Sequence, residues 1–438
     1  MDSHRPEAAA DILITGGCLL PVHPGLPAVL HPGYLAITDG RIMSLGPMAD
    51  CPPALAKAAG RILDARDRLV VPGLVNAHCH AAMTLFRGLA DDLPLATWLF
   101  EKIFPAEARF MDPEAVAAAS RLAAAEMLLA GTTTVADAYF HEDAAAGALA
   151  DLGLRVVAAQ GVIDFPAPGV PDPRENVARA RDFLGRWQGR HARVQPALFC
   201  HAPYTCSAAT LVAAKEAASA AGALWLTHVA ETRAEVERWQ AEHGMSPLQS
   251  LARLGVLDRG SVLVHGVWLD DADIEVLAAS GAGLVLCPRS NLKLACGISP
   301  LPALLAAGVP VALGTDGAAS NNRLDLFSEL ACCRALHRRA VPAPALLAMA
   351  TAGGAAVLGL GRWLGALAPG YAADVVIIEA PQPTAGEEEA VCRRRGADVR
   401  TVLVGGRVVV EERQLLTGDL AGIAGQVREL ARRVQPAP

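Results

Sequence analysis

Features of nucleic-acid-binding and membrane proteins are missing from this sequence. Its 38 Lys and Arg residues are outnumbered by 45 Asp and Glu, and they form no basic stripe that could follow a phosphate backbone. No apolar run is long enough to span a membrane without Gly, Pro or charge, and Met1–Glu7 shows no signal-peptide pattern. We therefore expect a cytoplasmic protein that acts on a small molecule, with neither nucleic acid nor membrane as a partner.

Paired cysteines are missing as well. The ten cysteines include no CxxC pair and no disulfide framework, and a chain of 438 residues needs no disulfide staples. The H-x-E and P-C-x-x-C signature of zinc-dependent cytidine deaminases is absent, because Cys200, Cys206 and Cys287 lack the required partner. We expect reduced, mostly buried thiols that do not bind a metal.

What the chain has is a regular alternation of apolar, β-branched runs with Ala-rich amphipathic segments, which predicts parallel strands covered by helices. The eight strand candidates are Leu69–Ala77, Thr132–Ala138, Arg155–Val162, Val194–His201, Leu224–His228, Ser261–Val267, Gly283–Cys287 and Val309–Thr315. Eight such units close into a (β/α)8 barrel of the TIM type, which we assign to residues 69–364. The hydrophobic fraction of 53% is ample for its core.

The two ends of the chain have a different pattern. Short runs with glycine-containing turns predict antiparallel strands in Asp11–Val22 and Tyr34–Leu45, and again in Asp374–Glu379 and Thr401–Val410. We expect residues 1–68 and 365–438 to combine in one small β-sandwich domain. Because no polar cluster converges in it, its expected role is structural.

Three strand candidates end in residues that can bind a metal ion. Side chains alternate along a strand, so His78 and His80 project to the same side while Cys79 points away. His228 and Asp316 stand at the ends of two other strands, and the C-terminal ends of barrel strands meet at one mouth. Three imidazoles and a carboxylate suit zinc with a position open for water. The alternative is a set of satisfied core histidines.

The fourth strand candidate, Val194–His201, contains no lysine. Binuclear hydrolases built on this plan bridge two metals with a carboxylated lysine from that strand. We therefore expect one divalent ion per subunit.

Proton transfer has three candidate residues near this metal site. Glu231 follows His228 closely enough to move protons as general acid and base, although it could instead be a carboxylate at a helix N-terminus. His265 ends the sixth strand and could orient the attacking water, or be a buried structural histidine. Asp316 could also take the first proton of the water, and its alternative role is a helix N-cap.

At these residues the sequence resembles the amidohydrolase superfamily, and within it most closely the 5′-methylthioadenosine/S-adenosylhomocysteine deaminases. The resemblance covers nearly the whole chain and is carried by Val71–His80, Phe104–Glu107, Met127–Asp137, His201–Ser207, His228–Thr232, Ser290–Leu294 and Leu313–Asn322. It implies hydrolytic deamination of an adenosine-type nucleoside to the inosine analogue and ammonia. The substrate would be 5′-methylthioadenosine, S-adenosylhomocysteine or adenosine.

The resemblance also implies the roles of individual residues. His78, His80, His228 and Asp316 would hold zinc, or iron, while Glu231 and His265 would transfer protons and orient water. Glu107 matches the carboxylate that binds the ribose 2′ and 3′ hydroxyls, which suits a group that can accept two hydrogen bonds. Its alternative is a surface carboxylate beside Arg109. His201 matches a histidine that contacts substrate.

The recognition of the 5′ substituent is the open part of this interpretation. Family members that bind the amino-acid tail of S-adenosylhomocysteine use an arginine after the third strand, where this chain has Gln160. A neutral amide cannot replace a guanidinium that pairs with a carboxylate. Arg174 in the next loop is the candidate to supply that charge. Trp98 and Leu99 are candidates for an apolar pocket wall, unless they belong to the core.

Two alternatives to this function remain at the level of sequence. A related amidohydrolase acting on a triazine, a free purine or pterin, or another aminated or halogenated heterocycle would lack the ribose contact at Glu107. A non-catalytic scaffold would have lost the metal ligands, which this chain retains. The Ala-rich outer segment Pro113–Ala130 could support self-association, so a homo-oligomer is expected.

Overall fold

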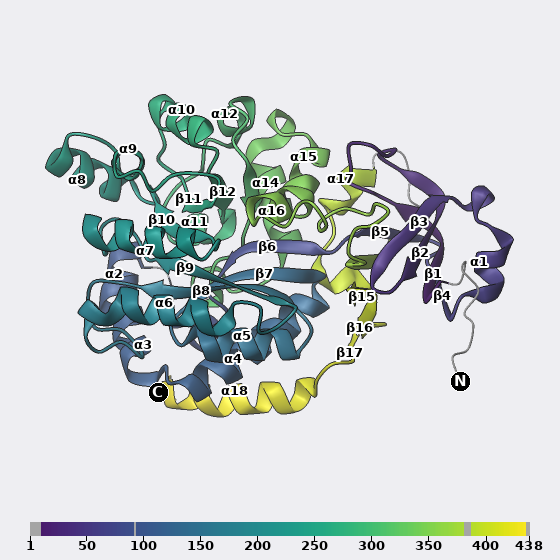
Figure 1. The fold of residues 1–438 in the computed structure, drawn as a ribbon, viewed down its shortest axis with the longest axis horizontal. Coiled ribbons are helices and arrows are strands. Elements are labelled where there is room, and N and C mark those ends of the chain that lie inside the picture. The colour runs from purple at the N-terminus through teal and green to yellow at the C-terminus, as the bar shows by residue number, and fades with distance from the viewer. Residues whose placement is uncertain (1–9, 92, 381–386, 435–438) are drawn as a thin grey trace.

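The structure, a computed structural model, describes residues 10–91, 93–380 and 387–434, so the segment Met1–Glu7 lies outside the described residues. Its larger part is a sheet of eight parallel strands in the order β13-β12-β11-β10-β9-β8-β7-β6 (Figure 1). The strands are β6 (Leu74–Cys79), β7 (Thr132–Tyr139), β8 (Arg155–Val162), β9 (Val194–Cys200), β10 (Trp225–Val229), β11 (Ser261–His265), β12 (Gly283–Leu286) and β13 (Val311–Leu313). The backbone N–H of Thr315 donates to the carbonyl of His78 at 3.1 Å and nearly closes the circle. The predicted (β/α)8 barrel is confirmed.

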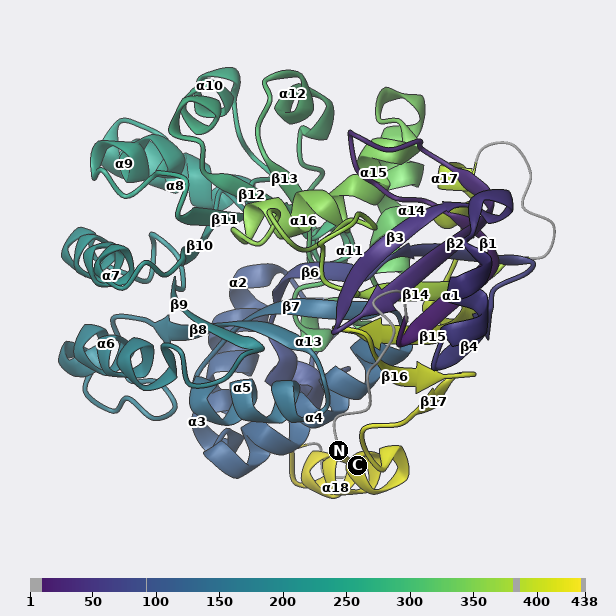
Figure 2. The ribbon, with the colours of Figure 1, turned by 45° about the vertical axis from the view of Figure 1, so that its right-hand side comes forward.

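Helices surround this barrel on its outer side (Figure 2). The helices of this part of the chain, some of which lie over the ends of the barrel, are α2 (Leu95–Thr97), α3 (Phe104–Phe110), α4 (Pro113–Leu129), α5 (Glu142–Asp151), α6 (Asn176–Trp187), α7 (Ala208–Ala220), α8 (Arg233–His243), α9 (Pro247–Arg253), α10 (Asp271–Ser280), α11 (Pro288–Lys293), α12 (Leu301–Ala306), α13 (Ala318–Asn321), α14 (Leu326–His337), α15 (Ala343–Met349) and α16 (Ala352–Val357), with a π-helix at Trp98–Ile103. Every residue of β6, β7, β10 and β11 is buried, which explains why these strands form continuous apolar runs in the sequence.

The first predicted barrel strand is wrong in one respect. Leu69–Ala77 is not a single strand, because β5 (Arg68–Pro72) belongs to a second sheet and only β6 belongs to the barrel. Gly73 joins the two, and a Cβ atom there would overlap with the side chain of Thr133. An apolar run buried on both faces carries no signal for the point at which the chain leaves one sheet for another.

The second sheet is mixed and has nine strands, built from both ends of the chain. Its strands are β1 (Ile12–Leu19), β2 (Leu30–Thr38), β3 (Arg41–Pro47), β4 (Arg61–Asp64), β5, β14 (Val375–Glu379), β15 (Val399–Val404), β16 (Arg407–Glu411) and β17 (Gln414–Leu415), and the short helices α1 (Pro53–Ala58) and α17 (Glu387–Val391) accompany it. The N-terminal and C-terminal parts meet where β5 pairs antiparallel with β14. Ile14, Ile37, Val70, Ile377 and Leu403 pack in one buried cluster. The expected small β domain formed from both ends is therefore confirmed.

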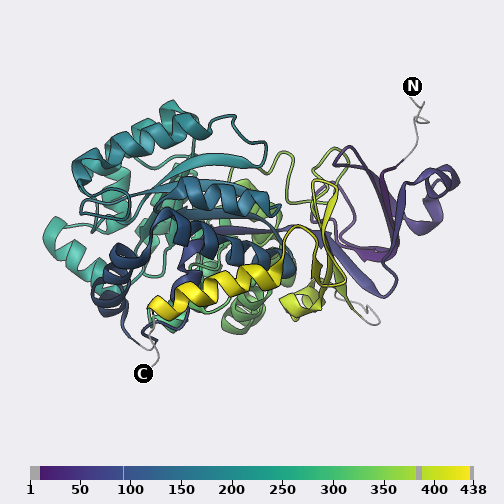
Figure 3. The same cartoon turned by 90° about the horizontal axis from the view of Figure 1, so that it is seen from below.

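The last helix, α18 (Leu420–Val434), leaves this β domain and runs along the barrel against α4 (Figure 3). The sequence pattern assigned residues 365–438, which include α18, to the β domain. Such a pattern predicts that a helix forms but does not identify the element against which it packs. Val427 is buried, and Leu430, Ala431 and Val434 pack on the cluster that includes Trp98, Leu99 and Ile103. The C-terminal helix thus supports the wall of the cavity described below. Within the described residues, no helix is long and apolar enough to cross a membrane.

Candidate metal centre and active-site cavity

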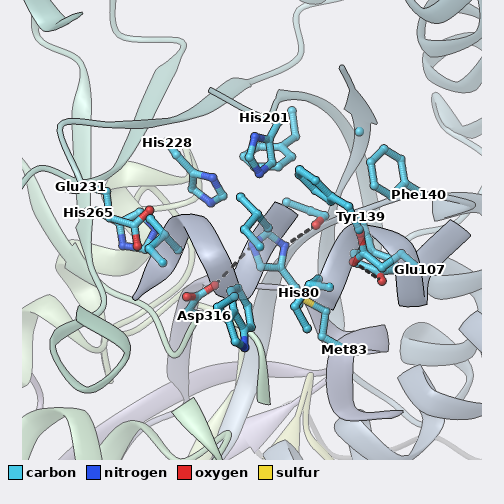
Figure 4. A pocket seen from close by; sticks show the side chains of 18 of the residues that line it. His80, Met83, Glu107, Tyr139, Phe140, His201, His228, Glu231, His265 and Asp316 are labelled. Atoms are coloured by element: carbon cyan, nitrogen blue, oxygen red, sulfur yellow. Dashed lines mark hydrogen bonds and ion pairs between the residues drawn. The ribbon is translucent and has the colours of Figure 1, made fainter. Parts of the chain in front are cut away.

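Four side chains from three strand ends, His78, His80, His228 and Asp316, converge at the mouth of the barrel, and Figure 4 shows the last three of them. His78 Nε2 lies 3.2 Å from His228 Nε2 and 3.6 Å from Asp316 Oδ1, and His80 Nε2 lies 3.3 Å from the same carboxylate oxygen. All four residues are buried or nearly so. The structure thus brings together the four ligands that the sequence suggested.

The protonation states of these histidines suit a cation. The Nδ1–H of His80 donates to the carbonyl of Ala138 at 2.5 Å, which leaves a lone pair on Nε2 facing the site. Burial and the neighbouring His80 lower the pKa of His78 to about 4, and burial lowers the pKa of His228 well below its usual value. Two imidazole nitrogens 3.2 Å apart, as those of His78 and His228 are, either share a proton or direct two lone pairs at a cation between them, and with His80 and the carboxylate of Asp316 beside them the donor set fits a divalent metal ion.

Asp316 is held by hydrogen bonds on its other oxygen. The hydroxyls of Ser290 and Ser320 donate to Asp316 Oδ2 at 2.5 and 2.7 Å, which leaves Oδ1 facing His78 and His80. Burial alone would raise the pKa of Asp316, but the surrounding histidines lower it well below its usual range. Gly317, and not Asp316, is the N-cap of α13, so the N-cap alternative does not describe this residue.

Glu231 and His265 form a second pair beside the metal centre. Glu231 Oε2 lies 3.7 Å from His265 Nε2, and Glu231 Oε1 accepts a hydrogen bond from the thiol of Cys296 at 3.5 Å. His265 Nδ1 lies 2.9 Å from the amide oxygen of Asn291, so Nδ1 carries the proton and Nε2 is free toward the site. Burial and the charge of Asp316 raise the pKa of Glu231 to about 8.

The local backbone explains why Glu231 points into the cavity. Ala230 and His265 have φ angles of 50° and 75°, so both strands end in sharp left-handed turns. The carboxylate of Glu235 accepts from the backbone N–H groups of Ala230 and Glu231 at 3.0 and 2.8 Å and fixes the first turn. Thr232 and Glu235 form the capping box of α8, so Glu231 is not needed as a helix cap.

A cavity of about 60 Å³ lies above the metal centre and is lined by polar groups at its base and apolar side chains around its wall. Its lining residues include His80, His201, His228, Glu231, His265, Asp316, Glu107, Tyr139, Met83, Leu95, Trp98, Leu99, Phe104, Phe140 and Leu294. In Figure 4, Glu231 and His265 lie on one side of His80 and Asp316, and Glu107 and Tyr139 lie on the other. A substrate that fills the cavity would touch both pairs.

Glu107 is a buried member of this cavity and not a surface carboxylate. It lies on α3, is 4% exposed, and accepts a hydrogen bond from the hydroxyl of Tyr139 at 2.6 Å. Burial raises the pKa of Glu107 to about 7, and the hydrogen bond from Tyr139 opposes this shift. His201 also lines the cavity, with its Nδ1 2.9 Å from the hydroxyl of Thr205.

The two remaining candidates have different positions. Trp98 is 4% exposed and both lines the cavity and packs in a core cluster, so its two proposed roles coexist. Arg174 does not reach the cavity: its side chain is 88% exposed and pairs with Asp172 at 2.7 Å. Gln160 is engaged with the backbone of Glu142 and Gly161. Among the described residues that line the cavity there is no Lys or Arg.

A wider groove of about 1040 Å³ adjoins the cavity and shares Leu95, Leu99 and Tyr204 with it. Its far side is formed by residues of α8 and α9, including Arg238 and Trp239. The three shared side chains therefore stand between the buried cavity and the outer groove.

Sequence reasoning missed several residues that orient the site. Tyr139 and Cys296 had no assigned role, and Ser290, Asn291 and Ser320 were noted only as parts of resembling stretches. Tyr139 has a recognisable signal, because it is a polar residue at the end of a predicted barrel strand. Ser290 and Ser320 lie in α11 and α13 and donate hydrogen bonds to Asp316 in the folded chain. No local sequence pattern predicts these contacts.

Comparison with known proteins gives a consistent result. The sequence profile of the Amidohydrolase family matches residues 69–409. The chain is 41% identical over 442 residues to a 5-methylthioadenosine/S-adenosylhomocysteine deaminase from Syntrophobacter fumaroxidans, covering 98% of this chain and 100% of that protein. The crystal structure of an adenosine deaminase from Xanthomonas campestris with bound zinc is similar with a TM-score of 0.94 and 35% identity, covering 99% of this chain and 100% of that one.

A second group of similar structures has a different chemistry. An atrazine chlorohydrolase from Arthrobacter aurescens TC1, complexed with zinc, matches with a TM-score of 0.87 and 24% identity over 96% of this chain and 100% of that one. At this identity the similarity shows the fold alone. Enzymes that catalyse different reactions can share this barrel fold.

Proposed function

This chain belongs to the amidohydrolase family, and we propose that it is a mononuclear zinc enzyme that hydrolytically deaminates adenosine-type nucleosides, with 5′-methylthioadenosine as the preferred substrate. The products are the inosine analogue and ammonia. The observation that carries the proposal is that one buried cavity joins the metal ligands, the Glu231 and His265 pair, and Glu107. The metal ligands and the Glu231 and His265 pair are suited to hydrolysis at a ring carbon, and Glu107 is suited to binding the hydroxyls of a sugar.

The metal would be held by His78, His80, His228 and Asp316. When bound, zinc lowers the pKa of a water molecule toward neutrality and so makes a nucleophile available. Zinc is favoured over iron because the similar adenosine deaminase from Xanthomonas campestris contains it. Ser290 and Ser320 hold the carboxylate of Asp316 so that one oxygen is kept for the ion.

Proton transfer would be performed by the residues beside the metal. Glu231, buried and with a raised pKa, is suited to give a proton to a ring nitrogen of adenine while water adds to the neighbouring C6. His265 and Asp316 orient the water and receive its proton. The proton taken from the water then passes to the amino group, which leaves as ammonia, while Glu231 takes up the remaining hydroxyl proton of the tetrahedral centre and is restored.

The substituent at the 5′ position meets an apolar environment. Leu95, Leu99 and Phe104 line the cavity, and none of its described lining residues is Lys or Arg. A carboxylate brought into such surroundings loses its hydration without gaining a partner. Within the cavity this supports a methylthio group over the charged homocysteinyl tail, since Arg174 faces solvent and Arg238 lies only in the outer groove.

The comparison with triazine hydrolases does not carry a second proposal. Glu107 is buried in the cavity and oriented by Tyr139, which supports recognition of a ribose. A cytoplasmic location and a homo-oligomer stay predictions from the sequence.

Ammonia release from zinc-loaded protein tests the proposal, with 5′-methylthioadenosine, adenosine, S-adenosylhomocysteine and adenine compared side by side. We expect kcat/KM to fall in that order, with adenine inactive because it has no sugar for Glu107. Glu231→Gln should reduce kcat by about a thousandfold while zinc stays bound, since a general acid and base contributes roughly 10² to 10⁴ in rate. Glu237→Gln, on the exposed face of α8, is the matched control. Zinc-bound protein that releases ammonia from none of the nucleosides would contradict the proposal.

A further inference from the structure

Tyr139 is the last residue of β7 and lies in the cavity between the metal centre and Glu107 (Figure 4). We propose that Tyr139 is a positioning residue that presents the carboxylate of Glu107 to the ribose hydroxyls, and so makes the enzyme selective for nucleosides with an intact 2′,3′-diol. The inference rests on the proposed function. Its physical basis is a single short hydrogen bond of 2.6 Å between two side chains that are 3% and 4% exposed.

The end of β7 holds three parts of the site in one frame. Asp137 Oδ1 accepts from the backbone N–H of Ala81 at 2.6 Å, directly after the metal-binding strand. The carbonyl of Ala138 accepts from His80, and the hydroxyl of Tyr139 donates to Glu107. Three consecutive residues therefore fix the chain after β6, the ring of a metal ligand and the carboxylate for the sugar. The position of Glu107 relative to His80 is therefore set by this strand end.

Glu107 needs such a partner because its helix gives it none. The helix α3 spans Phe104–Phe110, and its neighbours in the cavity wall are apolar, including Ile103 and Phe140. Burial raises the pKa of Glu107, and the hydrogen bond from Tyr139 is the one contact that opposes this shift. Tyr139 thereby favours the ionised form, which accepts hydrogen bonds on both oxygens.

The geometry leaves acceptor sites for the sugar. Tyr139 occupies one lone pair of Oε1, so Oε2 and the second lone pair of Oε1 remain for two hydroxyl donors. A phenylalanine in place of Tyr139 would keep the ring that packs beside Phe140 but would leave the carboxylate free to rotate and harder to ionise. Recognition of the diol would suffer, whereas the metal and Glu231 would be untouched.

The test compares Tyr139→Phe with the wild-type protein on adenosine and on 2′,3′-dideoxyadenosine. A buried hydrogen bond to a charged group is worth roughly tenfold in binding, so we expect kcat/KM for adenosine to fall about tenfold, mainly through KM. The value for dideoxyadenosine should change less than about twofold, since that substrate lacks the hydroxyls that Glu107 binds. A merely structural role would reduce both substrates alike, and this result, or no change on adenosine, would overturn the inference.

Two further variants complete the design. In a Glu107→Gln background, Tyr139→Phe should have little additional effect on adenosine, because the two residues act as a unit. Tyr371→Phe removes a tyrosine hydroxyl that donates to the carbonyl of Gly361, far from the cavity, and should leave both substrates unchanged.

Equilibrium binding separates this inference from the proposed function. Calorimetry with the products inosine and 2′,3′-dideoxyinosine needs no turnover, and Tyr139→Phe should weaken only the binding of inosine. If the wild-type protein does not deaminate the nucleosides but Tyr139→Phe still loses affinity for inosine and not for dideoxyinosine, the deaminase proposal fails and the role of Tyr139 stands. If inosine and dideoxyinosine bind the wild-type protein equally, the role of Tyr139 is refuted whatever the activity.

Discussion

The mouth of the barrel and the mixed β sheet are both built from apolar strands, but they treat charged groups in opposite ways. At the barrel mouth, Glu107 and Glu231 are buried without an Arg or Lys partner, and burial raises the pKa of each. In the mixed sheet, the ion pairs Arg68–Glu412 and Arg400–Glu379 lie at the surface. A buried carboxylate without a counter-charge lowers the stability of the fold, so such groups are found where a reaction needs them. In the mixed sheet, which has no candidate site within the described residues, the carboxylates of Glu379 and Glu412 lie at the surface and are paired with arginines.

Left-handed backbone occurs in both regions but serves a different purpose in each. Ala230, His265 and Asp316 have positive φ angles at the ends of barrel strands, where their side chains or the next ones turn into the cavity. In the mixed sheet, Asp39 and Gly40 have such angles between β2 and β3, and Glu412 and Arg413 have them between β16 and β17. At the barrel mouth this conformation therefore places candidate functional side chains, whereas in the sheet it closes turns between strands.

The largest effect that we expect in this comparison is a loss of folding stability when a buried ion pair of the mixed sheet is broken. Asp374 is the buried exception of the mixed sheet: its side chain is 2% exposed, pairs with Arg155 at 2.9 Å and accepts from the backbone of Gly405. Asp374→Ala would leave the guanidinium of Arg155, whose side chain is 14% exposed, without a carboxylate partner, so we expect the free energy of unfolding to fall by about 3 to 5 kcal/mol. Chemical denaturation followed by circular dichroism measures it, and kcat of the folded protein should not change.

Glu379→Ala is the matched control for that prediction, because it removes a carboxylate from an exposed pair with Arg400 in the same sheet. We expect a loss below about 1 kcal/mol. Equal losses in the two variants would mean that burial does not decide the strength of ion pairs in this domain.

The second effect concerns the metal centre. Ser290→Ala removes the 2.5 Å hydrogen bond to Asp316 Oδ2 and leaves the carboxylate held by Ser320 alone. Because residues that orient a metal ligand typically contribute 10-fold to 100-fold, we expect zinc affinity to fall by roughly that factor. Competition with a metal chelator measures the affinity. Ser328→Ala, on a hydroxyl that bonds to Asp325 outside the cavity, should leave zinc binding unchanged.

The third effect is a pH dependence of substrate choice. With its pKa near 7, Glu107 is ionised above this pH and protonated below it, and the protonated form loses acceptor capacity for the ribose hydroxyls. The ratio of kcat/KM for adenosine to that for 2′,3′-dideoxyadenosine should therefore fall as the pH is lowered from about 8.5 to about 6, by up to about tenfold. The ratio cancels the titration of the metal centre and Glu231, which both substrates share. A ratio that does not change with pH would show that Glu107 does not titrate in this range.

The sequence predicted those parts of the molecule that follow from local rules. Alternation along a strand and the convergence of strand ends were enough to predict that His78, His80, His228 and Asp316 lie close together. Contacts between loops follow no such rule, so the hydroxyls of Ser290 and Ser320 were not connected to Asp316. The same limit applies to the division at Gly73, where one apolar run serves two sheets and only the partner strands decide which residues belong to each.

The smallest expected effect concerns Arg174. It tests whether this exposed arginine takes part in binding the charged tail of a substrate. The sequence offered this residue, from the loop after Gln160, as a substitute partner for a tail carboxylate, but its side chain is 88% exposed and bonds to Asp172 in its own turn. A guanidinium that stays in water contributes little to a site it does not touch. Arg174→Ala should therefore change the ratio of kcat/KM for 5′-methylthioadenosine to that for S-adenosylhomocysteine by less than about twofold, as should Arg179→Ala, which removes another exposed ion pair nearby. A selective loss on S-adenosylhomocysteine in Arg174→Ala alone would show that this loop turns inward when the charged tail is bound, and the apolar cavity would then no longer explain the preference for the methylthio group.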